Sequence, residues 1–251
     1  MTQLVLSLFP GIGLLDMAFE EEGFCVVRGP DLLWGGDIRR FHPPAGKFDG
    51  VIGGPPCQAH SRLVGIVRAR WGDDAVAEDL IPEFRRCVIE AAPAWYLMEN
   101  VPGAPTADVP GYFQTWTLLN NRWLGEKQNR VRRFSFGSRE AAQQLKIADI
   151  AALEAMDFEA AVCSTSGGRR TPVKIGGSGK PKGPNGKTYS PLTIRPFTQE
   201  CELQGLPADF LNGAPFTQQG KRVVVGNGVP LPMGRAVARA VKRALGLEVA
   251  P

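Results

Sequence analysis

The sequence contains few cysteines and no cysteine motif. Its five cysteines are an odd number, lie far apart and form no Cys-x-x-Cys pair. This pattern fits neither a disulfide framework nor a zinc site and indicates a reducing compartment. No apolar run is long enough to span a membrane, the amino terminus lacks the basic stretch of a signal peptide, and no internal repeat is present. These absences predict a soluble, cytoplasmic protein without a metal site.

The totals of the sequence indicate an ordered, globular chain. Its 251 residues suffice for one large domain, alone or with a small appendage. Hydrophobic residues make up 43% of the chain, which is enough for a packed core and argues against disorder. The formal charge of +4 is compatible with a polyanionic partner but does not identify one by itself.

One stretch, FDGVIGGPPCQAHSRL at residues 48–63, places a cysteine directly after a predicted strand. The Gly-Gly-Pro-Pro run must end that strand, because proline has no N–H for the sheet and glycine weakens strand interiors. Cys57 therefore follows the carboxyl end of a strand, where open α/β sheets bind their ligands. Taken alone, the stretch fits a reactive thiol and a buried structural cysteine about equally well.

A glycine-rich turn follows the first predicted strand, at residues 4–8. The turn FPGIG leads into the apolar spacing of a helix at residues 14–22. Such a turn lets a ligand approach the backbone near a helix N-terminus, although simple turn formation explains it too. Asp31 and Asp37 follow a second predicted strand at residues 24–27. Carboxylates there suit ribose hydroxyls or an adenine amino group, or they only form turns.

Two further predicted strands carry polar side chains at their ends. Residues 94–98 predict a buried strand that leads into Glu99 and Asn100, where a glutamate is hard to explain as a solvated surface charge. Arg130 and Arg132 alternate along a strand predicted within residues 122–137, so their side chains point to one face. They are either solvated or part of a site.

The remaining elements are predicted from apolar spacing and from glycine and proline breakers. Residues 62–79 are predicted to form a long surface loop, a kind of segment that usually covers or binds a ligand. The predicted helices are residues 81–92, residues 111–121, one or two helices within 140–158, a short helix capped by Thr198 and ending at Gln204, and a closing helix at 234–245. A last strand is predicted at residues 223–225.

A basic segment lies between residues 163 and 192. It is rich in glycine, serine, proline and threonine and contains six basic residues and no acidic one. Such a segment buries little and needs a partner or stays disordered. A phosphate-contacting element is favoured over a flexible linker.

Six blocks of the chain together resemble the DNA cytosine-C5 methyltransferase family. They are FPGIG, PPCQ, ENV, QNRVR, TQECELQG and GNGVP, in the order in which the family has them. The blocks extend from the first strand to the last helix and leave residues 139–192 outside the match. Each block is weak alone, whereas the six in order are specific.

The resemblance implies an α/β fold with a Rossmann-like class I methyltransferase sheet that binds S-adenosylmethionine. It implies an AdoMet-binding catalytic domain made of residues 1–138 and 221–251, and a small target-recognition domain at residues 139–220. The implied partner is double-stranded DNA, with no membrane involved, and the chain is expected to be a monomer.

The implied reaction is methyl transfer to C5 of cytosine. Because C5 is a poor nucleophile, the Cys57 thiolate adds to C6 and turns the ring into an enamine that accepts the methyl group. Glu99 binds the N3 and amino edge of the base, Arg132 with Arg130 holds its O2 edge, and Asn100 supports the loop that carries Cys57. The target base must leave the duplex to reach the thiol.

The resemblance also assigns the residues that surround the two substrates. The matching cofactor positions are Phe9, Gly11, Gly13, Asp31, Asp37, Ile38, Pro56, Asn227, Gly228 and Val229. The expected DNA contacts are Gln58, Ser61, Arg62, Arg68, Arg70, Arg169, Arg170 and Lys174, of which Ser61 to Arg70 belong to the predicted lid.

The chain departs from the family's pattern around the cofactor. Asp31 stands in place of a glutamate, only six positions separate it from Asp37, where the family has a helix, and Trp34 is the candidate to replace a missing aromatic side chain. His60 stands in place of a phenylalanine. Three other functions stay open: methylation of RNA (tRNA), DNA binding with weak catalysis, and transfer of a modified group from an S-adenosylmethionine derivative.

Overall fold

A six-stranded mixed sheet forms the centre of the protein. The structure, a computed structural model, describes residues 2–60, 64–150, 159–160, 170–172 and 192–249. The strand order is β2-β1-β3-β4-β7-β5. The strands are β1 (Leu4–Leu8), β2 (Cys25–Arg28), β3 (Gly50–Gly53), β4 (Trp95–Asn100), β5 (Phe113–Asn120) and β7 (Val131–Ser138).

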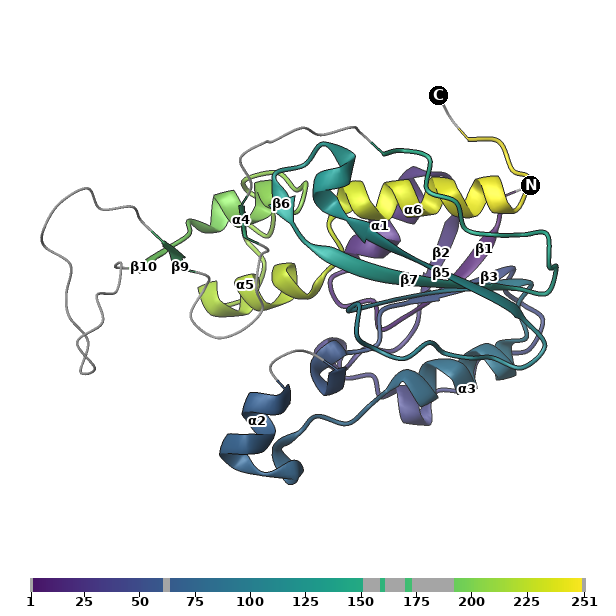
Figure 1. The fold of residues 1–251 in the computed structure, drawn as a ribbon, viewed down its shortest axis with the longest axis horizontal. Coiled ribbons are helices and arrows are strands. Elements are labelled where there is room, and N and C mark those ends of the chain that lie inside the picture. Colours follow the sequence, from purple (N-terminus) through teal and green to yellow (C-terminus); the bar gives the residue numbers. More distant parts are fainter. Residues whose placement is uncertain (1, 61–63, 151–158, 161–169, 173–191, 250–251) are drawn as a thin grey trace, which may run out of the picture.

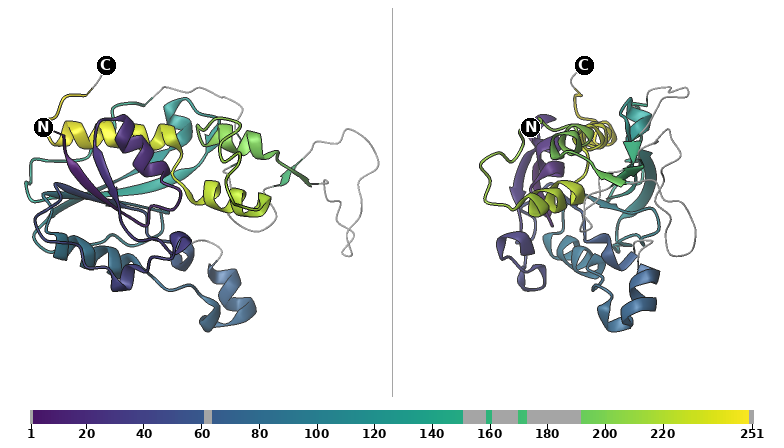
Figure 2. Two further views of the ribbon diagram at one scale, coloured as in Figure 1. Left: turned by 180° about the vertical axis from the view of Figure 1, so that it is seen from behind. Right: turned by 90° about the vertical axis from the view of Figure 1, so that its left-hand side faces the viewer.

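Helices cover both faces of this sheet. Helices α1 (Leu14–Glu21) and α6 (Leu231–Ala244) lie on one face and α3 (Ile81–Ala91) lies on the other (Figure 1). Helices α4 (Phe197–Leu203) and α5 (Gln218–Asn227) extend beyond one end of the sheet, as the view from behind also shows (Figure 2). The fold is therefore the Rossmann-like α/β architecture that the sequence predicts. The remaining strands are short: β6 (Gln128–Asn129), β8 (Glu159–Ala160), β9 (Arg170–Pro172) and β10 (Leu192–Ile194).

Two hydrophobic clusters hold the layers together, and the alternation of side chains along the strands decides which cluster each residue joins. Trp95, Leu97 and Phe134 pack with α1 and α6. Tyr96 and Met98 pack with α3. Because β1, β3 and β4 bury nearly all their residues, they read as continuous apolar runs in the sequence.

The direction of the strands brings the polar motifs to one edge of the sheet. Strands β2, β1, β3 and β4 are parallel, whereas β7 runs antiparallel to both of its neighbours. The register pairs Asn100, the last residue of β4, with Arg133 near the start of β7. The beginning of β7 therefore lies beside the carboxyl ends of the parallel strands.

A third cluster joins α4 and α5 to the central layers. Cys201 of α4 and Val225 of α5 pack with Leu14 and Ala18 of α1. Residues near Cys201, which the resemblance assigns to the small target-recognition domain, thus share a core with helix α1. The proposed boundaries of that small domain, residues 139–220, stay a prediction.

Five predicted strands and four predicted helices lie where the sequence puts them, namely β1, β2, β3, β4, β7, α1, α3, α4 and α6. The predicted helix at residues 111–121 is wrong, because this stretch forms strand β5 and pairs along its whole length with β7. The predicted strand at residues 223–225 is also wrong, because it lies in α5. A run of valines fits a helix here because Val224 and Val225 are buried by tertiary contacts.

Three weaker predictions need correction. The part of the predicted surface loop that the structure describes contains helix α2 (Val64–Trp71). Residues 140–150 contain no helix, and the rest of that predicted helical stretch lies outside the described residues. Helix α4 begins at Phe197 with no side-chain cap, so Thr198 lies inside the helix rather than capping it. Among the described residues, no helix is both long and apolar enough to cross a membrane.

Candidate active site

A cavity of about 270 Å³ opens at the carboxyl edge of the parallel strands. This volume is close to the lower end of the range for small-molecule sites. The cavity is lined by the ends of β1, β3 and β4, the start of α1, and the junction of α5 and α6. The predicted site residues that line it are Phe9, Gly11, Asp31, Pro56, Cys57, Gln58, Glu99, Arg132, Asn227, Gly228 and Val229.

A thiol, a carboxylate and a guanidinium meet at one end of this cavity. Cys57 begins the short 3-10 helix Cys57–His60 directly after the two prolines. The Nε of Arg132 lies 2.8 Å from Oε1 of Glu99. Both side chains are largely buried, with 18% and 11% of their surface exposed. Gly54 permits this approach, since a Cβ there would lie only 3.1 Å from Oε2 of Glu99.

Burial raises the pKa of the Cys57 thiol above its ordinary value, and the negative charge of Glu99 raises it further. The positive charges of Arg132 and Arg130 act in the opposite direction. The ligand-free protein therefore holds the protonated thiol. A reaction that needs the thiolate must remove this proton or reduce the influence of Glu99.

Two polar side chains hold backbone segments of the cavity. One bonds the loop that carries Cys57, and the other bonds the wall formed by residues 226–228. Asn100 donates from Nδ2 to the Pro55 carbonyl at 3.1 Å, two residues before Cys57. Arg130, only 3% exposed, donates from Nη2 to the carbonyls of Gly226 and Gly228 at 3.0 and 3.1 Å. Arg130 thus lies behind the cavity wall rather than in the lining.

Two glutamines that sequence reasoning did not single out strengthen the same wall. Gln204 is fully buried and donates from Nε2 to the Val225 carbonyl at 2.5 Å and to the Gly228 carbonyl at 3.2 Å. Gln128 donates to Oε1 of Gln204 at 3.0 Å. Gln128 lies in the block QNRVR and Gln204 in the block TQECELQG. Membership in these blocks could have identified both glutamines as site residues from the sequence. Their contacts fix the junction that presents Asn227 to the cavity.

The glycine turn and the segment after β2 are joined by hydrogen bonds. Gly11 N–H donates to Oδ2 of Asp31 at 2.8 Å, and the Trp34 indole donates to the Gly11 carbonyl at 2.7 Å. Phe9 adopts a φ of 56°, a strained value for a residue with a side chain. Gly13, the N-cap of α1 at φ 82°, lies behind this turn and outside the lining. The turn is therefore held rigidly at the mouth of the cavity.

A buried aspartate in the lining was also missed by sequence reasoning. Asp16 in α1 accepts from Ser7 Oγ at 2.5 Å and from Arg28 Nε at 3.0 Å. Its side chain is only 1% exposed, and burial raises its pKa despite these two donors. One indication of this residue is present in the sequence, namely that Asp16 is a lone acidic residue in the first turn of an apolar helix.

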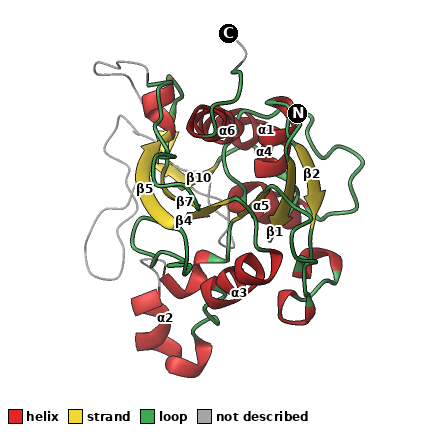
Figure 3. Cartoon of the chain, turned by 90° about the vertical axis from the view of Figure 1, so that its right-hand side faces the viewer, coloured by secondary structure: helices red, strands yellow, loops and turns green. Residues whose placement is uncertain are grey.

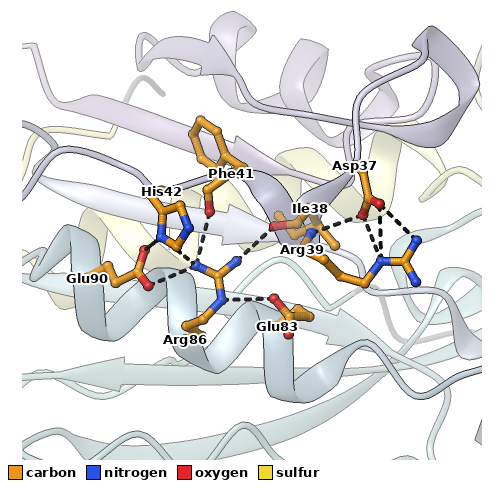
Figure 4. Close-up of polar contacts among 8 residues, drawn as sticks. All are labelled: Asp37, Ile38, Arg39, Phe41, His42, Glu83, Arg86 and Glu90. Atoms are coloured by element: carbon orange, nitrogen blue, oxygen red, sulfur yellow. Dashed lines mark hydrogen bonds and ion pairs between the residues drawn. The ribbon is translucent and has the colours of Figure 1, made fainter.

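Asp37 and Ile38, the expected adenine contacts, do not line the cavity. The Asp37 carboxylate accepts from the backbone and side chain of Arg39, which lowers its pKa to about 2. Ile38 is buried against β1 and α3. Arg86 of α3 clamps this segment by donating to the carbonyls of Ile38 and Phe41 (Figure 4).

The same arginine is itself fixed by two glutamates. Arg86 lies 2.8 Å from both Glu83 and Glu90 along α3, and Glu90 also contacts His42 at 3.1 Å (Figure 4). These ion pairs direct residues 38–42 toward α3 and away from the cavity. Asp37 and Ile38 therefore contribute nothing to the lining of the cavity.

The expected DNA contacts are described only in part. Gln58 is exposed at the cavity rim. In α2, Arg68 pairs with Asp73 at 2.5 Å, and the guanidinium of Arg70 lies 5.0 Å from the Trp71 ring centroid. The other residues expected to contact DNA lie outside the described residues or have undescribed side chains: Ser61, Arg62, Arg169, Arg170 and Lys174.

Comparison with known proteins gives one family and several relatives. The family described as C-5 cytosine-specific DNA methylase matches residues 35–162. The chain is 30% identical over 167 residues to the Type II methyltransferase M.NgoPII of Neisseria gonorrhoeae, covering 54% of this chain and 48% of the relative. It is 27% identical over 169 residues to the orphan methyltransferase M.SPRI of Bacillus phage SPR, covering 54% and 38%.

The chain spans about half the length of curated relatives that it matches over 165 to 167 residues. Among solved structures, a putative DNA modification methyltransferase from an Escherichia coli prophage is similar, with a TM-score of 0.61, 17% identity and coverage of 98% and 100%. An Entamoeba histolytica methyltransferase also has a TM-score of 0.61, with 12% identity and coverage of 98% and 99%. At such low identity these two structures support the fold alone.

Proposed function

Because the chain belongs to the C-5 cytosine-specific DNA methylase family, which matches just over half of it, we propose that it transfers a methyl group to C5 of cytosine in DNA. The observation that carries this proposal is the shared cavity of Cys57, Glu99 and Arg132. A nucleophile, a carboxyl group and a cation in one cavity supply the groups that a pyrimidine ring needs for activation.

The methyl donor of this proposal is S-adenosylmethionine. The cavity suits it, because its lining includes the Asp31 carboxylate and the apolar side chains of Phe9, Ile12 and Val229. Asp31 would accept from ribose hydroxyls, the apolar side chains would surround the adenine, and the glycine turn at the start of α1 would receive the carboxylate. When bound, the donor supplies an electrophilic methyl group.

The residues of the chain would activate the cytosine. Cys57, as thiolate, adds to C6 and makes a C–S bond, so that electron density moves to C5. Glu99 donates a proton or hydrogen bond to N3 and stabilises the negative charge that this addition creates in the ring. Arg132 keeps Glu99 in place and binds the O2 edge. After methylation, loss of the C5 proton and breaking of the C–S bond release the product and restore Cys57.

The base must reach the cavity from outside the duplex, since a thiol at a strand end cannot contact C6 of a stacked base. Helix α2 and the exposed Gln58 are close enough in sequence to Cys57 to form a cover over the extruded base. Unstacking requires on the order of a few kcal/mol, which contacts to the DNA backbone must offset.

One experiment tests this function directly. The full chain is incubated with tritiated S-adenosylmethionine and, in parallel, with duplex DNA, single-stranded DNA or tRNA, and the nucleosides are then analysed. Labelled 5-methylcytosine from duplex DNA supports the proposal. Label in tRNA alone would make the chain an RNA methyltransferase, and no label with any substrate, while DNA is still bound, would contradict catalysis. The Cys57→Ser variant, which should bind the cofactor but transfer nothing, is the control.

A further inference from the structure

Arg133 lies next to Arg132 in β7 but on the opposite face of the sheet. Successive residues of a strand point to opposite faces. Arg132 therefore points to the cavity and Glu99, whereas Arg133 points to the side on which α3 lies. The register pairs Arg133 with Asn100 of β4 and with Leu118 of β5. Asn100 supports the Cys57 loop, so Arg133 lies at the same sheet edge as the proposed active site.

The Arg133 guanidinium has donors without acceptors. Its Nε and Nη2 atoms are shielded from solvent, and neither has a hydrogen-bond partner among the described residues. Burial alone accounts for the lowering of its pKa, with no carboxylate near enough to oppose it. Shielding a charged donor without an acceptor is costly, and such groups in a folded protein mark sites where a ligand supplies the acceptor.

An exposed aromatic side chain lies beside this cation. The Arg133 guanidinium carbon is 5.8 Å from the ring centroid of Trp116 in β5, and 57% of the Trp116 surface is exposed. Leu118, on the same face of β5, is 38% exposed. Strand β5 is the edge of the sheet, so no further strand of the six-stranded sheet covers it.

Arg133 and Trp116 lie on the same side of the sheet as helix α2, which belongs to the proposed lid. Viewed along the sheet from either end, helix α2 lies beneath β5, on the α3 side (Figure 2, right, and Figure 3). Helix α2 carries a second arginine against a tryptophan, Arg70 with Trp71, and Trp71 is 60% exposed. Both elements therefore present cationic and aromatic side chains outside the cavity.

We propose that Arg133 and Trp116 form a contact for the DNA backbone, in which Arg133 binds a phosphate that flanks the target nucleotide and Trp116 packs against the adjoining sugar or base. A phosphate offers the acceptors that Arg133 lacks, in a geometry that suits its planar fork of donors. An exposed tryptophan stacks on any base without regard to sequence. Since no described residue accepts a hydrogen bond from Nε or Nη2, rotation of the side chain can bring the guanidinium to the phosphate.

This inference rests on the proposed function, and its test measures DNA binding by the full chain. Anisotropy of a short fluorescein-labelled DNA duplex gives Kd over a series of salt concentrations. Loss of one phosphate contact in Arg133→Gln should reduce the slope of log Kd against log salt by about 0.9 and weaken binding by up to roughly tenfold at about 0.1 M salt. Arg133→Lys, which keeps the charge, should retain the slope.

Arg139 supplies the matched control. It follows β7 at the other end of the strand and lies 5.1 Å from the Tyr112 ring, but it donates to the Pro93 carbonyl at 3.0 Å. Arg139→Gln should leave Kd and the salt slope unchanged and lower the melting temperature. Arg133→Gln should not lower the melting temperature, because no internal hydrogen bond is lost.

The outcomes separate this inference from the function on which it rests. If the wild-type chain binds duplex DNA and Arg133→Gln matches it in Kd and slope, the phosphate contact is refuted while the proposed function stands. If the wild-type chain neither binds nor methylates DNA, the function itself fails. Trp116→Phe should reduce the quenching of tryptophan emission by added duplex, and unchanged quenching would exclude Trp116 from the contact.

Discussion

Replacing Glu99 with glutamine should make the Cys57 thiol more reactive toward an alkylating reagent while it slows methyl transfer. The negative charge of Glu99 raises the pKa of Cys57, and the charge of Arg132 lowers it. The two charges lie 2.8 Å apart and partly cancel. In Glu99→Gln the arginine is no longer neutralised, so the thiolate is favoured for two reasons at once.

The size of the effect follows from these two changes. A charge within a few ångströms shifts a pKa by about one unit or more, so the fraction of thiolate below the pKa rises about tenfold. A thiolate of lower pKa is also a weaker nucleophile, with a Brønsted coefficient of about 0.4–0.5. The net alkylation rate at a pH below the pKa should therefore rise about three- to fourfold.

The assay is alkylation with iodoacetamide in the absence of ligands, followed by mass spectrometry of the peptide that contains Cys57. Cys25, which is exposed, serves as an internal reference in the same sample. A pH series should show the rise in Cys57 reactivity shifted to lower pH in Glu99→Gln and to higher pH in Arg132→Gln. The methyl-transfer rate of Glu99→Gln should fall by more than about tenfold.

A slower or unchanged alkylation of Cys57 relative to Cys25 in Glu99→Gln would refute the electrostatic coupling between the two side chains. A faster alkylation together with an unchanged methyl-transfer rate would retain the coupling but remove Glu99 from the chemistry. The account requires that Glu99→Gln speeds alkylation of Cys57 and slows methyl transfer. This combination is expected if Glu99 disfavours the thiolate in the free protein and assists the cytosine during the reaction.

Four further substitutions test the cavity and the fold. Arg130→Gln should destabilise the protein by about 2–4 kcal/mol in urea unfolding, because the carbonyls of Gly226 and Gly228 each lose a charged donor, and calorimetry should show weaker S-adenosylmethionine binding. Asp31→Ala should weaken that binding roughly tenfold or more, whereas Asp37→Ala, whose carboxylate bonds Arg39 instead, should change it little; equal losses would contradict the assigned lining. Gly137→Ala should destabilise the sheet by at least about 2 kcal/mol, since a Cβ there would lie 2.1 Å from the Tyr96 ring, and an unchanged urea midpoint would refute this packing.

The buried strands of this fold were predictable, whereas the edge of the sheet was not. Strands β1, β3 and β4 are mostly apolar and are followed by glycine, proline or polar residues, so local sequence identifies them. Strand β5 has a mixed pattern because three of its eight residues are exposed and only two are buried. Its identity depends on pairing with β7, a contact that local propensity does not contain.

Sequence motifs indicated which residues belong to the site but not how they act. The Gln-x-Arg-x-Arg block predicts two site arginines, and only the structure separates Arg132 in the cavity from Arg130 behind its wall. The spacing after Asp31 showed that the segment is short. It could not show that Arg86 clamps residues 38–42 to α3, because that contact joins residues 48 positions apart.

The most direct test of the central claim is to trap the bond between Cys57 and the cytosine ring. The chain is incubated with S-adenosylmethionine and duplex DNA in which 5-fluorocytosine replaces cytosine, and the products are separated under denaturing conditions. Fluorine at C5 cannot leave as the proton does, so the C–S bond should persist. A covalent protein–DNA complex that forms with the wild-type chain and not with Cys57→Ser, with the adduct located on the Cys57 peptide, is the predicted result. Methylation of normal DNA without any trapped complex, or a complex attached to another residue, would contradict Cys57 as the nucleophile.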